Sequence, residues 1–251
     1  MPRATRLGML TPSSNTVLEP VTSAMLAGTP DITAHFSRFR VTEIALSDQA
    51  LRQFDDSERL LAARLLADAK VDVIAWNGTS AAWMGFEHDE ALCARIRAAT
   101  GIAATTTVLA FRELFRRTGV TRVGLVTPYL DDVQAKIIAN WSVAGFACSA
   151  ERHRGLQDNF SFAAVTPEDI AAMTRAVVQD GCEAVAIVCT NMRGAHLATT
   201  LEAELGLPVY DSVAVTLLEC LRLAGCDPRV IRGWGGLFSD PRNHPWWGGS
   251  A

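Results

Sequence analysis

The segment TRLGMLTP at residues 5–12 returns, with small changes, as TRVGLVTP at residues 121–128. Five of the eight positions are identical, and the other three are apolar in both copies. Each copy has the apolar run of a short buried strand and ends in a proline, which is typical of the start of a loop. The chain therefore contains an internal repeat, and each copy of the repeat begins with a buried strand.

A second pair of matched segments follows in the same order, VIAWNGTS at 73–80 and AVAIVCTN at 184–191. Both begin as continuous apolar runs, which is typical of strands covered on both faces of a parallel sheet. Farther along each copy we expect a last helix, over residues 108–117 in the first and 213–224 in the second. A glycine follows each of these helices closely, as a candidate C-cap.

Strands that alternate with helices at this spacing predict an α/β fold with two pseudo-symmetric, doubly wound (Rossmann-like) lobes. We expect the first lobe over residues 1–118 and the second over 119–251. Whether the last helix and tail, about 213–251, pack back on the first lobe is left open. Ligands in open α/β sheets bind beyond the carboxyl ends of the strands. The repeat therefore predicts a shared active-site cleft formed by four loops, at residues 11–16, 78–82, 127–132 and 189–194.

The composition is that of an ordinary globular protein, with 49% apolar and 20% charged residues and a net charge of −4. The lack of a basic excess argues against nucleic acid and anionic membranes as partners. No window approaches the ~20 apolar residues that cross a bilayer, and the first residues do not resemble a signal peptide. We therefore expect a cytoplasmic protein. A homo-oligomer is left open, with Trp246 and Trp247 of an irregular tail as candidates for a subunit contact.

The cysteines and histidines do not form metal-binding or disulfide patterns. Six cysteines show no C-x-x-C pair, and five histidines show no H-x-H or H-E-x-x-H pair. In a reducing compartment such cysteines are free thiols, most of them buried as small apolar side chains. We therefore expect no metal site and no disulfide framework.

The first loop carries Pro12, Ser13 and Asn15 ahead of an apolar run. Small polar residues in this position are typical of a helix N-terminus, where free backbone N–H groups and the helix dipole favour a carboxylate. Taken alone, this loop is better explained by ordinary N-capping, because caps of this kind are common. The three residues are therefore candidate substrate contacts only in combination with the other loops.

The second and third loops offer hydroxyl groups. Gly78 lets a ligand approach the backbone closely, and Thr79 and Ser80 can donate hydrogen bonds to an oxyanion. An ordinary capped turn explains these three residues equally well. In the third loop, Tyr129 can donate its O–H to a substrate oxygen, although a half-buried aromatic with a solvated tip is a common alternative.

The fourth loop begins with Cys189 and Thr190. A thiol at a strand end, beside the N-terminus of a helix, is placed where its pKa can be lowered and its proton exchanged. For a single cysteine, an inert buried role is the more common alternative. The repeat, however, places Cys189 opposite Gly78 in one cleft. Trp76, Trp83 and the segment 159–162 are further candidates for shaping the pocket, with a core role for the tryptophans equally open.

Over nearly its whole length the chain resembles the aspartate/glutamate racemase superfamily, in the branch that holds maleate isomerases and arylmalonate decarboxylases. The segment 12–16 resembles the N-terminal substrate loop of maleate isomerases. The segments 78–80 and 129–133, together with Cys189, resemble arylmalonate decarboxylases. Each motif is weak alone, but four in register are specific. The resemblance implies an enzyme without a metal or organic cofactor, with a small dicarboxylate as its substrate.

One departure from the superfamily pattern narrows the expected reaction. Racemases and isomerases of this superfamily typically carry one cysteine on each side of the cleft, whereas here Gly78 takes the first-lobe position. The decarboxylases of the branch share this arrangement of glycine and cysteine. The resemblance thus favours decarboxylation of a 2-substituted malonate. One carboxylate would be held by Thr79, Ser80, Tyr129 and the backbone near Thr190, and Cys189 would protonate the enediolate on one face.

Two other functions remain as alternatives at this point. A maleate cis–trans isomerase or an Asp/Glu-type racemase would need a replacement for the missing thiol, and Asn15 in its Ser-Ser-Asn-Thr setting fits the isomerases. A two-lobed binding protein would close on a small acid without chemistry. A thiol that faces oxyanion donors in a pocket favours catalysis over binding alone.

Overall fold

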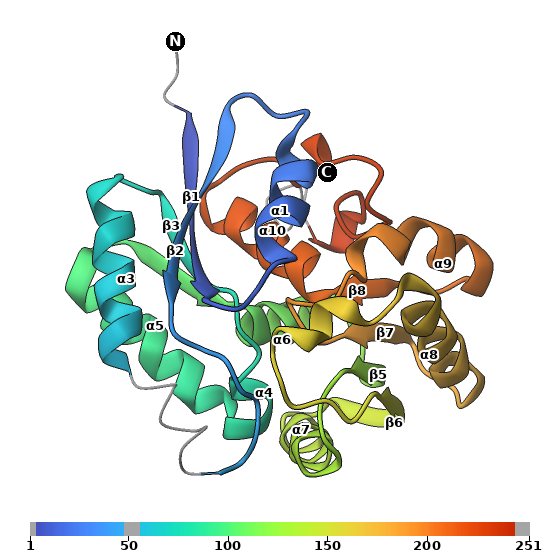
Figure 1. The fold of residues 1–251 in the computed structure, drawn as a ribbon. Helices are drawn as coiled ribbons and strands as arrows, with labels where there is room; N and C mark the ends of the chain where they lie inside the picture. The colour runs from blue at the N-terminus through green and yellow to red at the C-terminus, as the bar shows by residue number, and fades with distance from the viewer. Residues whose placement is uncertain (1–3, 48–55, 244–251) are drawn as a thin grey trace.

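The computed structural model describes residues 4–47 and 56–243, and Trp246 and Trp247 lie outside these ranges. The repeat quoted above forms β1 and β5, which are central strands of two separate parallel sheets (Figure 1). The strand order is β2-β1-β3-β4 in the first sheet and β6-β5-β7-β8 in the second. Because the two orders are equivalent position by position, the predicted α/β fold with two matched lobes is confirmed.

The first copy of the repeat contains β1 (Thr5–Pro12), α1 (Leu18–Leu26), β2 (Ile32–Phe39), α3 (Asp56–Asp68), β3 (Val73–Trp76), α4 (Ala81–Met84), α5 (Phe86–Thr100), β4 (Ala103–Thr106) and α6 (Thr107–Thr118). The second contains β5 (Arg122–Thr127), α7 (Asp131–Val143), β6 (Ala147–His153), the 3-10 turn η2 (Ser161–Ala164), α8 (Pro167–Gln179), β7 (Ala184–Ile187), η3 (Ala195–Leu197), α9 (Ala198–Leu205), β8 (Val209–Asp211) and α10 (Ser212–Leu223). Two further 3-10 turns, η4 (Pro228–Val230) and η5 (Pro241–Asn243), follow. None of the helices within the described ranges has the length and apolar character needed to cross a membrane.

The strands β3 and β7, inside their sheets, are covered on both faces. Every residue of β3 and β7 is buried, as the continuous apolar runs predicted. The edge strands β2 and β6 are mostly half-exposed and more polar, so their sequences lack this signal. Burial of the apolar strand faces is the main stabilising contribution, at roughly 25 cal/mol per Å² of apolar surface removed from water.

The last helix of each copy starts and stops where its sequence predicts, to within one residue. Thr106 caps α6 by accepting a hydrogen bond from the Leu109 N–H, and Asp211 caps α10 by accepting from Val213 and Ala214. Gly119 ends α6 with a φ of 72°, a left-handed conformation that glycine adopts at little cost.

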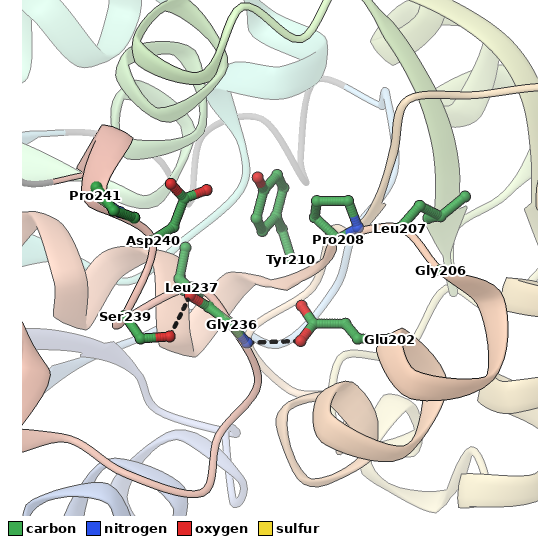
Figure 2. Close-up of a pocket in the computed structure, with 10 residues that line it drawn as sticks. All are labelled: Glu202, Gly206, Leu207, Pro208, Tyr210, Gly236, Leu237, Ser239, Asp240 and Pro241. Carbon is green, nitrogen blue, oxygen red and sulfur yellow. Dashed lines mark hydrogen bonds between the residues drawn. The ribbon is translucent and has the colours of Figure 1, made fainter.

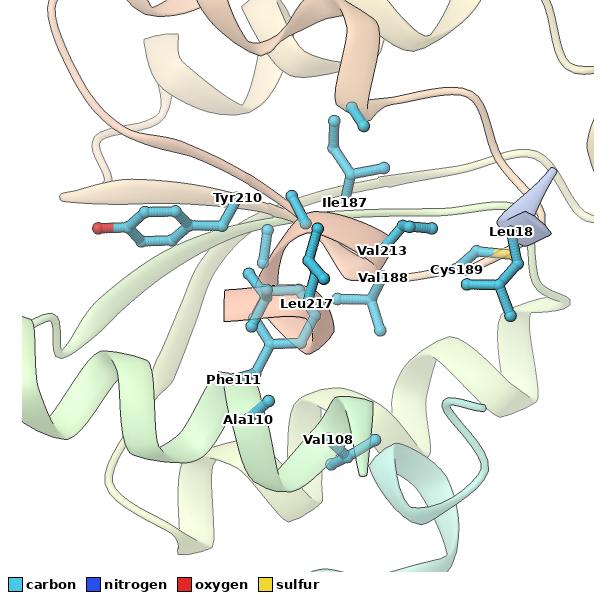
Figure 3. Packing of buried hydrophobic residues seen from close by; sticks show 14 of the residues in the cluster. Leu18, Val108, Ala110, Phe111, Ile187, Val188, Cys189, Tyr210, Val213 and Leu217 are labelled. Carbon is cyan, nitrogen blue, oxygen red and sulfur yellow. The ribbon is translucent and has the colours of Figure 1, made fainter. Parts of the chain in front are cut away.

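These two helices lie between the sheets and tie the lobes together. α10 packs against α1, β3 and β4 of the first sheet as well as against α6. In the opposite direction, Phe111 of α6 contacts Trp141 of α7, with ring centroids 5.8 Å apart. The hydroxyls of Thr107 and Thr216 lie 2.8 Å apart where the helices cross. Figure 3 shows Phe111 of α6 beside Leu217 of α10, and Val108 and Val188 belong to the same buried cluster.

Candidate functional site

The carboxyl ends of the central strands converge on one small cavity between the lobes. Its lining comes from all four predicted loops and from two further segments: Pro12, Val41, Ile44, Trp76, Gly78, Thr79, Ser80, Trp83, Tyr129, Asn159, Cys189 and Thr190. Seven of the nine predicted site residues are in this set. The topology therefore brings together side chains that lie as much as 178 positions apart in the sequence.

The other two predicted residues, Ser13 and Asn15, do not line the cavity but support its rim. The Ser13 hydroxyl bonds both the backbone N–H and the C=O of Val41, at 3.2 and 3.3 Å. The Asn15 carboxamide oxygen accepts from the N–H groups of Val17 and Leu18, each at 2.9 Å, so it caps the start of α1. The sequence analysis offered N-capping as the alternative role for this loop, and the Asn15 side-chain oxygen has that role.

Thr190 and Asn15 join the two lobes beside the cavity. The Asn15 Nδ2 donates to Thr190 Oγ1 at 3.1 Å, and Thr190 Oγ1 donates to the Asn77 carbonyl at 3.0 Å. Both side chains are buried. The Thr190 hydroxyl is therefore bonded to Asn15 on one side and to the Asn77 carbonyl on the other. These hydrogen bonds keep the strand ends after β3 and β7 at a fixed separation.

The hydroxyls predicted to bind an oxyanion form a chain with the thiol. Tyr129 Oη lies 2.6 Å from Thr79 Oγ1, and the Tyr129 hydroxyl also hydrogen-bonds the thiol of Cys189. The Tyr129 ring packs edge-on against Trp83, with centroids 5.3 Å apart, and against Phe162, at 5.4 Å. The aromatic contacts fix the ring, and the hydroxyl is aimed between the two strand ends.

Burial decides the protonation state of Cys189. It raises the pKa of the thiol to about 12, against the opposing effects of hydrogen bonds from the Asn191 N–H and the Tyr129 hydroxyl. The Asn191 N–H lies 3.4 Å from Cys189 Sγ. The sequence predicted a lowered pKa from the position beside a helix start, and this was wrong. The loop does supply donors to the sulfur, but loss of water around it outweighs them.

A buried carboxyl that the sequence did not single out adds to this effect. Asp211, at the end of β8, is 1% exposed, and burial raises its pKa to about 7. Its negative charge acts on Cys189 and raises the pKa of the thiol. Asp211 ends a strand that neighbours β7, so its place in the repeat was the signal available in the sequence.

Two loop segments close over the cavity from opposite lobes. One follows β2 and contributes Val41 and Ile44, and the other follows β6 and contributes Asn159. The segments pair by backbone hydrogen bonds, from Ile44 N–H to the Gln157 carbonyl at 2.9 Å and from Asn159 N–H to the Thr42 carbonyl at 3.0 Å. The enclosed volume is about 20 Å³, which suits one or two water molecules.

A larger pocket lies elsewhere in the second lobe. Figure 2 shows its lining, which consists of Glu202, Gly206, Leu207, Pro208, Tyr210, Gly236, Leu237, Ser239, Asp240 and Pro241, and its volume is about 470 Å³. Leu207 and Pro208 precede β8, so this pocket is at the amino end of the strand. The Glu202 carboxylate already accepts from the Val209 and Gly236 N–H groups. The pocket contains none of the predicted site residues and lies away from the carboxyl ends where ligands of such sheets bind.

The remaining thiols lie outside the cavity. All six cysteines are free thiols in this structure. Burial raises the pKa of Cys93 and of Cys148 to about 12, so these thiols are also protonated at neutral pH. Over residues 4–47 and 56–243, no group of three His, Cys, Asp or Glu side chains is placed to hold a metal ion.

Comparison with known proteins matches this arrangement to one family. The family model described as arylmalonate decarboxylase matches residues 8–238. The chain is 28% identical to an arylmalonate decarboxylase of Bordetella bronchiseptica over 182 residues, covering 71% of this chain and 75% of that one. It is 26% identical to a maleate isomerase of Pseudomonas putida over 246 residues, covering 93% and 97%.

The fold comparison agrees with the sequence comparison. A variant of a Pseudomonas putida maleate isomerase, crystallised with maleate, superimposes with a TM-score of 0.87 at 25% identity, covering 94% of this chain and 98% of that one. The superposition includes both lobes. Since the family model spans nearly the whole chain, including all four loops of the cavity, the protein belongs to the arylmalonate decarboxylase family of enzymes.

Proposed function

We propose that the protein is a cofactor-independent decarboxylase of a 2-substituted malonate, with Cys189 as the proton donor. The observation that carries this proposal is the composition of the cavity, where one thiol stands opposite a glycine. Among the described lining residues, Cys189 supplies the one thiol, and Thr79 and Tyr129 supply hydroxyls beside it. The similarity to the Bordetella bronchiseptica decarboxylase supports the same reaction.

In the proposed reaction, the bond between the α-carbon and one carboxylate breaks and CO2 leaves. The electron pair stays on the α-carbon and spreads into the remaining carboxylate, which becomes an enediolate. The hydroxyls of Thr79, Ser80 and Tyr129 donate to the enediolate oxygens. A well-placed donor of this kind contributes about 3–4 kcal/mol to the stabilisation of the transition state.

Cys189 then transfers its S–H proton to the α-carbon and becomes a thiolate. A pKa of about 12 keeps the thiol protonated, and so ready to donate, throughout the neutral range. The thiolate formed in this step is stabilised by the Asn191 N–H at 3.4 Å and by the Tyr129 hydroxyl. A proton from water restores the thiol before the next turnover.

The opposite wall of the cavity supports protonation from one side only. On the first-lobe side, the described lining consists of Gly78, two hydroxyl residues, and the apolar or aromatic side chains of Pro12, Val41, Ile44, Trp76 and Trp83. None of these is an acid or base in the neutral range. The product of a prochiral malonate is therefore a single enantiomer.

The proposal is tested by incubating the pure protein in D2O with phenylmalonate and with methylmalonate, and by following CO2 release and product NMR. We expect CO2 and a product with one deuterium at the α-carbon. Absence of CO2 with both malonates, under conditions where the diacid binds, would contradict the proposal.

A second candidate function is cis–trans isomerisation of maleate. It is supported by the similarity to the Pseudomonas putida maleate isomerase over 93% of the chain. This reaction would need a nucleophile on the side of Gly78. The same assay with maleate distinguishes the two, because formation of fumarate without CO2 release would favour the isomerase.

A further inference from the structure

Trp76 occupies the wall of the cavity that faces Cys189. It is the last residue of β3 and is 1% exposed. Its ring packs against Phe39, with centroids 4.9 Å apart, and the Arg59 guanidinium lies 5.9 Å from the ring centroid. These neighbours hold the indole in one place in the cavity wall.

The indole also fills the space beside Gly78. A Cβ atom at position 78 would lie 1.9 Å from Trp76 Cζ2 and 2.3 Å from Cε2, which is far inside van der Waals contact. Residues two apart in an extended strand point to the same face, and the Asn77 N–H continues the sheet pairing by donating to the Leu10 carbonyl at 3.0 Å. Trp76 and Gly78 thus share one face, and the ring takes the room that any side chain at 78 would need.

The indole N–H is a donor without a protein acceptor. Trp76 Nε1 is fully buried and has no hydrogen-bond partner among the described residues. It is bonded to Cε2, the atom 2.3 Å from the position of a Cβ at 78, and the side chain that carries it lines the cavity. Buried N–H groups in folded proteins nearly always have partners, and an unpaired one in a ligand cavity points to an acceptor on the ligand.

The charge beside this donor favours an anionic acceptor. The Arg59 cation interacts with the face of the indole ring. A cation over the face of the ring polarises the indole and makes its N–H a stronger donor. A donor of this kind suits a carboxylate oxygen on the first-lobe side of the cavity.

We propose that Trp76 is a substrate-binding and specificity-determining residue, whose indole N–H donates to a carboxylate oxygen of the bound diacid while its ring keeps position 78 free of a side chain. The inference rests on the proposed function in one respect, that a diacid binds beside Cys189. Substrates would then be selected for a carboxylate on the Trp76 side, and monoacids of similar shape would bind more weakly.

The test uses the full-length protein labelled with ¹⁵N-tryptophan and titrated with succinate, a diacid that has no malonate carboxylate to lose. The Trp76 indole resonance is assigned as the one absent from W76F. We expect this resonance to move downfield on saturation. We also expect W76F, which keeps an aromatic ring but loses the N–H, to raise the Kd for succinate about tenfold or more, as loss of a hydrogen bond to a charged group does.

The matched control is W141F, because Trp141 Nε1 is also buried and unpartnered among the described residues but does not line the cavity. W141F should bind succinate with the wild-type Kd. An unmoved Trp76 resonance in the saturated protein, or a wild-type Kd in W76F, overturns the inference even if CO2 is released from malonates. A shifted resonance without CO2 release from malonates overturns the proposed reaction and leaves the role of Trp76 intact.

Discussion

The two matched strand ends of this protein differ in what they present to the same cavity. After β7, the second lobe presents a thiol, Cys189, with backbone and hydroxyl donors around its sulfur. After β3, the first lobe presents Gly78, with the Trp76 ring over it. Because the strand order around each end is equivalent, the asymmetry lies in a few side chains. One duplicated scaffold can thus place its proton chemistry on one side and its shape selection on the other.

The largest effect should come from removing the thiol from the second strand end. C189A is expected to lower the rate of CO2 release by about 10²–10⁴-fold, the usual contribution of a positioned general acid. The cavity lining is otherwise unchanged, so the thermal midpoint should stay near that of the wild type. The measurement is steady-state CO2 release with phenylmalonate or methylmalonate.

A second buried thiol serves as the control for this variant. Cys93 lies on α5, is 5% exposed and is not part of the cavity lining. C93A should therefore release CO2 at the wild-type rate. If C189A released CO2 as fast as C93A, Cys189 would not be the proton donor, and the proposed difference between the two strand ends would be wrong.

Tyr129 joins the two strand ends, and Y129F should have the next largest effect. The variant removes the hydroxyl that bonds Thr79 at 2.6 Å and reaches Cys189. We expect a loss of about 10²–10³ in kcat, as for one oxyanion donor. The chain contains two tyrosines, and Tyr210 is buried outside this cavity. Y210F is therefore the matched control, and an equal loss in both variants would point to a structural cause.

The match between sequence and structure was best where burial leaves a pattern. The repeated segments at 5–12 and 121–128 each form a central strand, and Gly78 and Cys189 follow the two strands whose apolar runs are continuous. Strand ends in parallel sheets meet at one edge, so seven of nine predicted site residues reach one cavity. The apolar runs and the loops that follow them can be recognised in the sequence without knowing which distant segments are in contact.

What the sequence could not predict depends on contacts between distant segments. The pairing of Ile44 with Gln157 joins residues 113 positions apart, and it encloses the cavity from which Cys189 takes its raised pKa. Without this closure, a strand-end thiol near backbone donors is expected to have a lowered pKa, and that expectation was wrong. Trp76 is the last residue of β3 and Gly78 lies two residues farther along, and this spacing was a local signal that the ring covers the glycine.

The packing of Trp76 over Gly78 can be measured as a loss of stability. G78A is expected to lower the free energy of unfolding by about 1–3 kcal/mol, because its Cβ would lie 1.9 Å from a buried ring that must move. The cost should be smaller in a W76V background, where the ring is absent, and the difference is the coupling between the two positions. Denaturant unfolding of the four proteins gives this number.

The control for the strand-end glycine is Gly28, where an added Cβ meets nothing within 4 Å. G28A should leave the free energy of unfolding within about 0.5 kcal/mol of the wild type. If G78A costs the same in both Trp76 backgrounds, the ring is not what keeps position 78 free of a side chain.

The smallest expected effect is a pH dependence of stability that distinguishes the N-caps of α6 and α10. Thr106 caps α6 with a neutral hydroxyl, whereas Asp211 caps α10 with a carboxyl whose pKa is raised by burial from 3.8 to about 7. A raised folded-state pKa means that the folded protein binds the proton more tightly than the unfolded chain does. The contribution to stability is therefore complete below pH 4 and is lost as the pH rises through 7. Between pH 6 and pH 8 the free energy of unfolding should fall by about 1 kcal/mol from this group.

The control is D211N, which keeps an oxygen that can cap α10 but cannot titrate. Its free energy of unfolding should therefore stay level between pH 6 and pH 8. An equal pH slope in D211N and in the wild type would assign the titration to another group and leave the two caps equivalent.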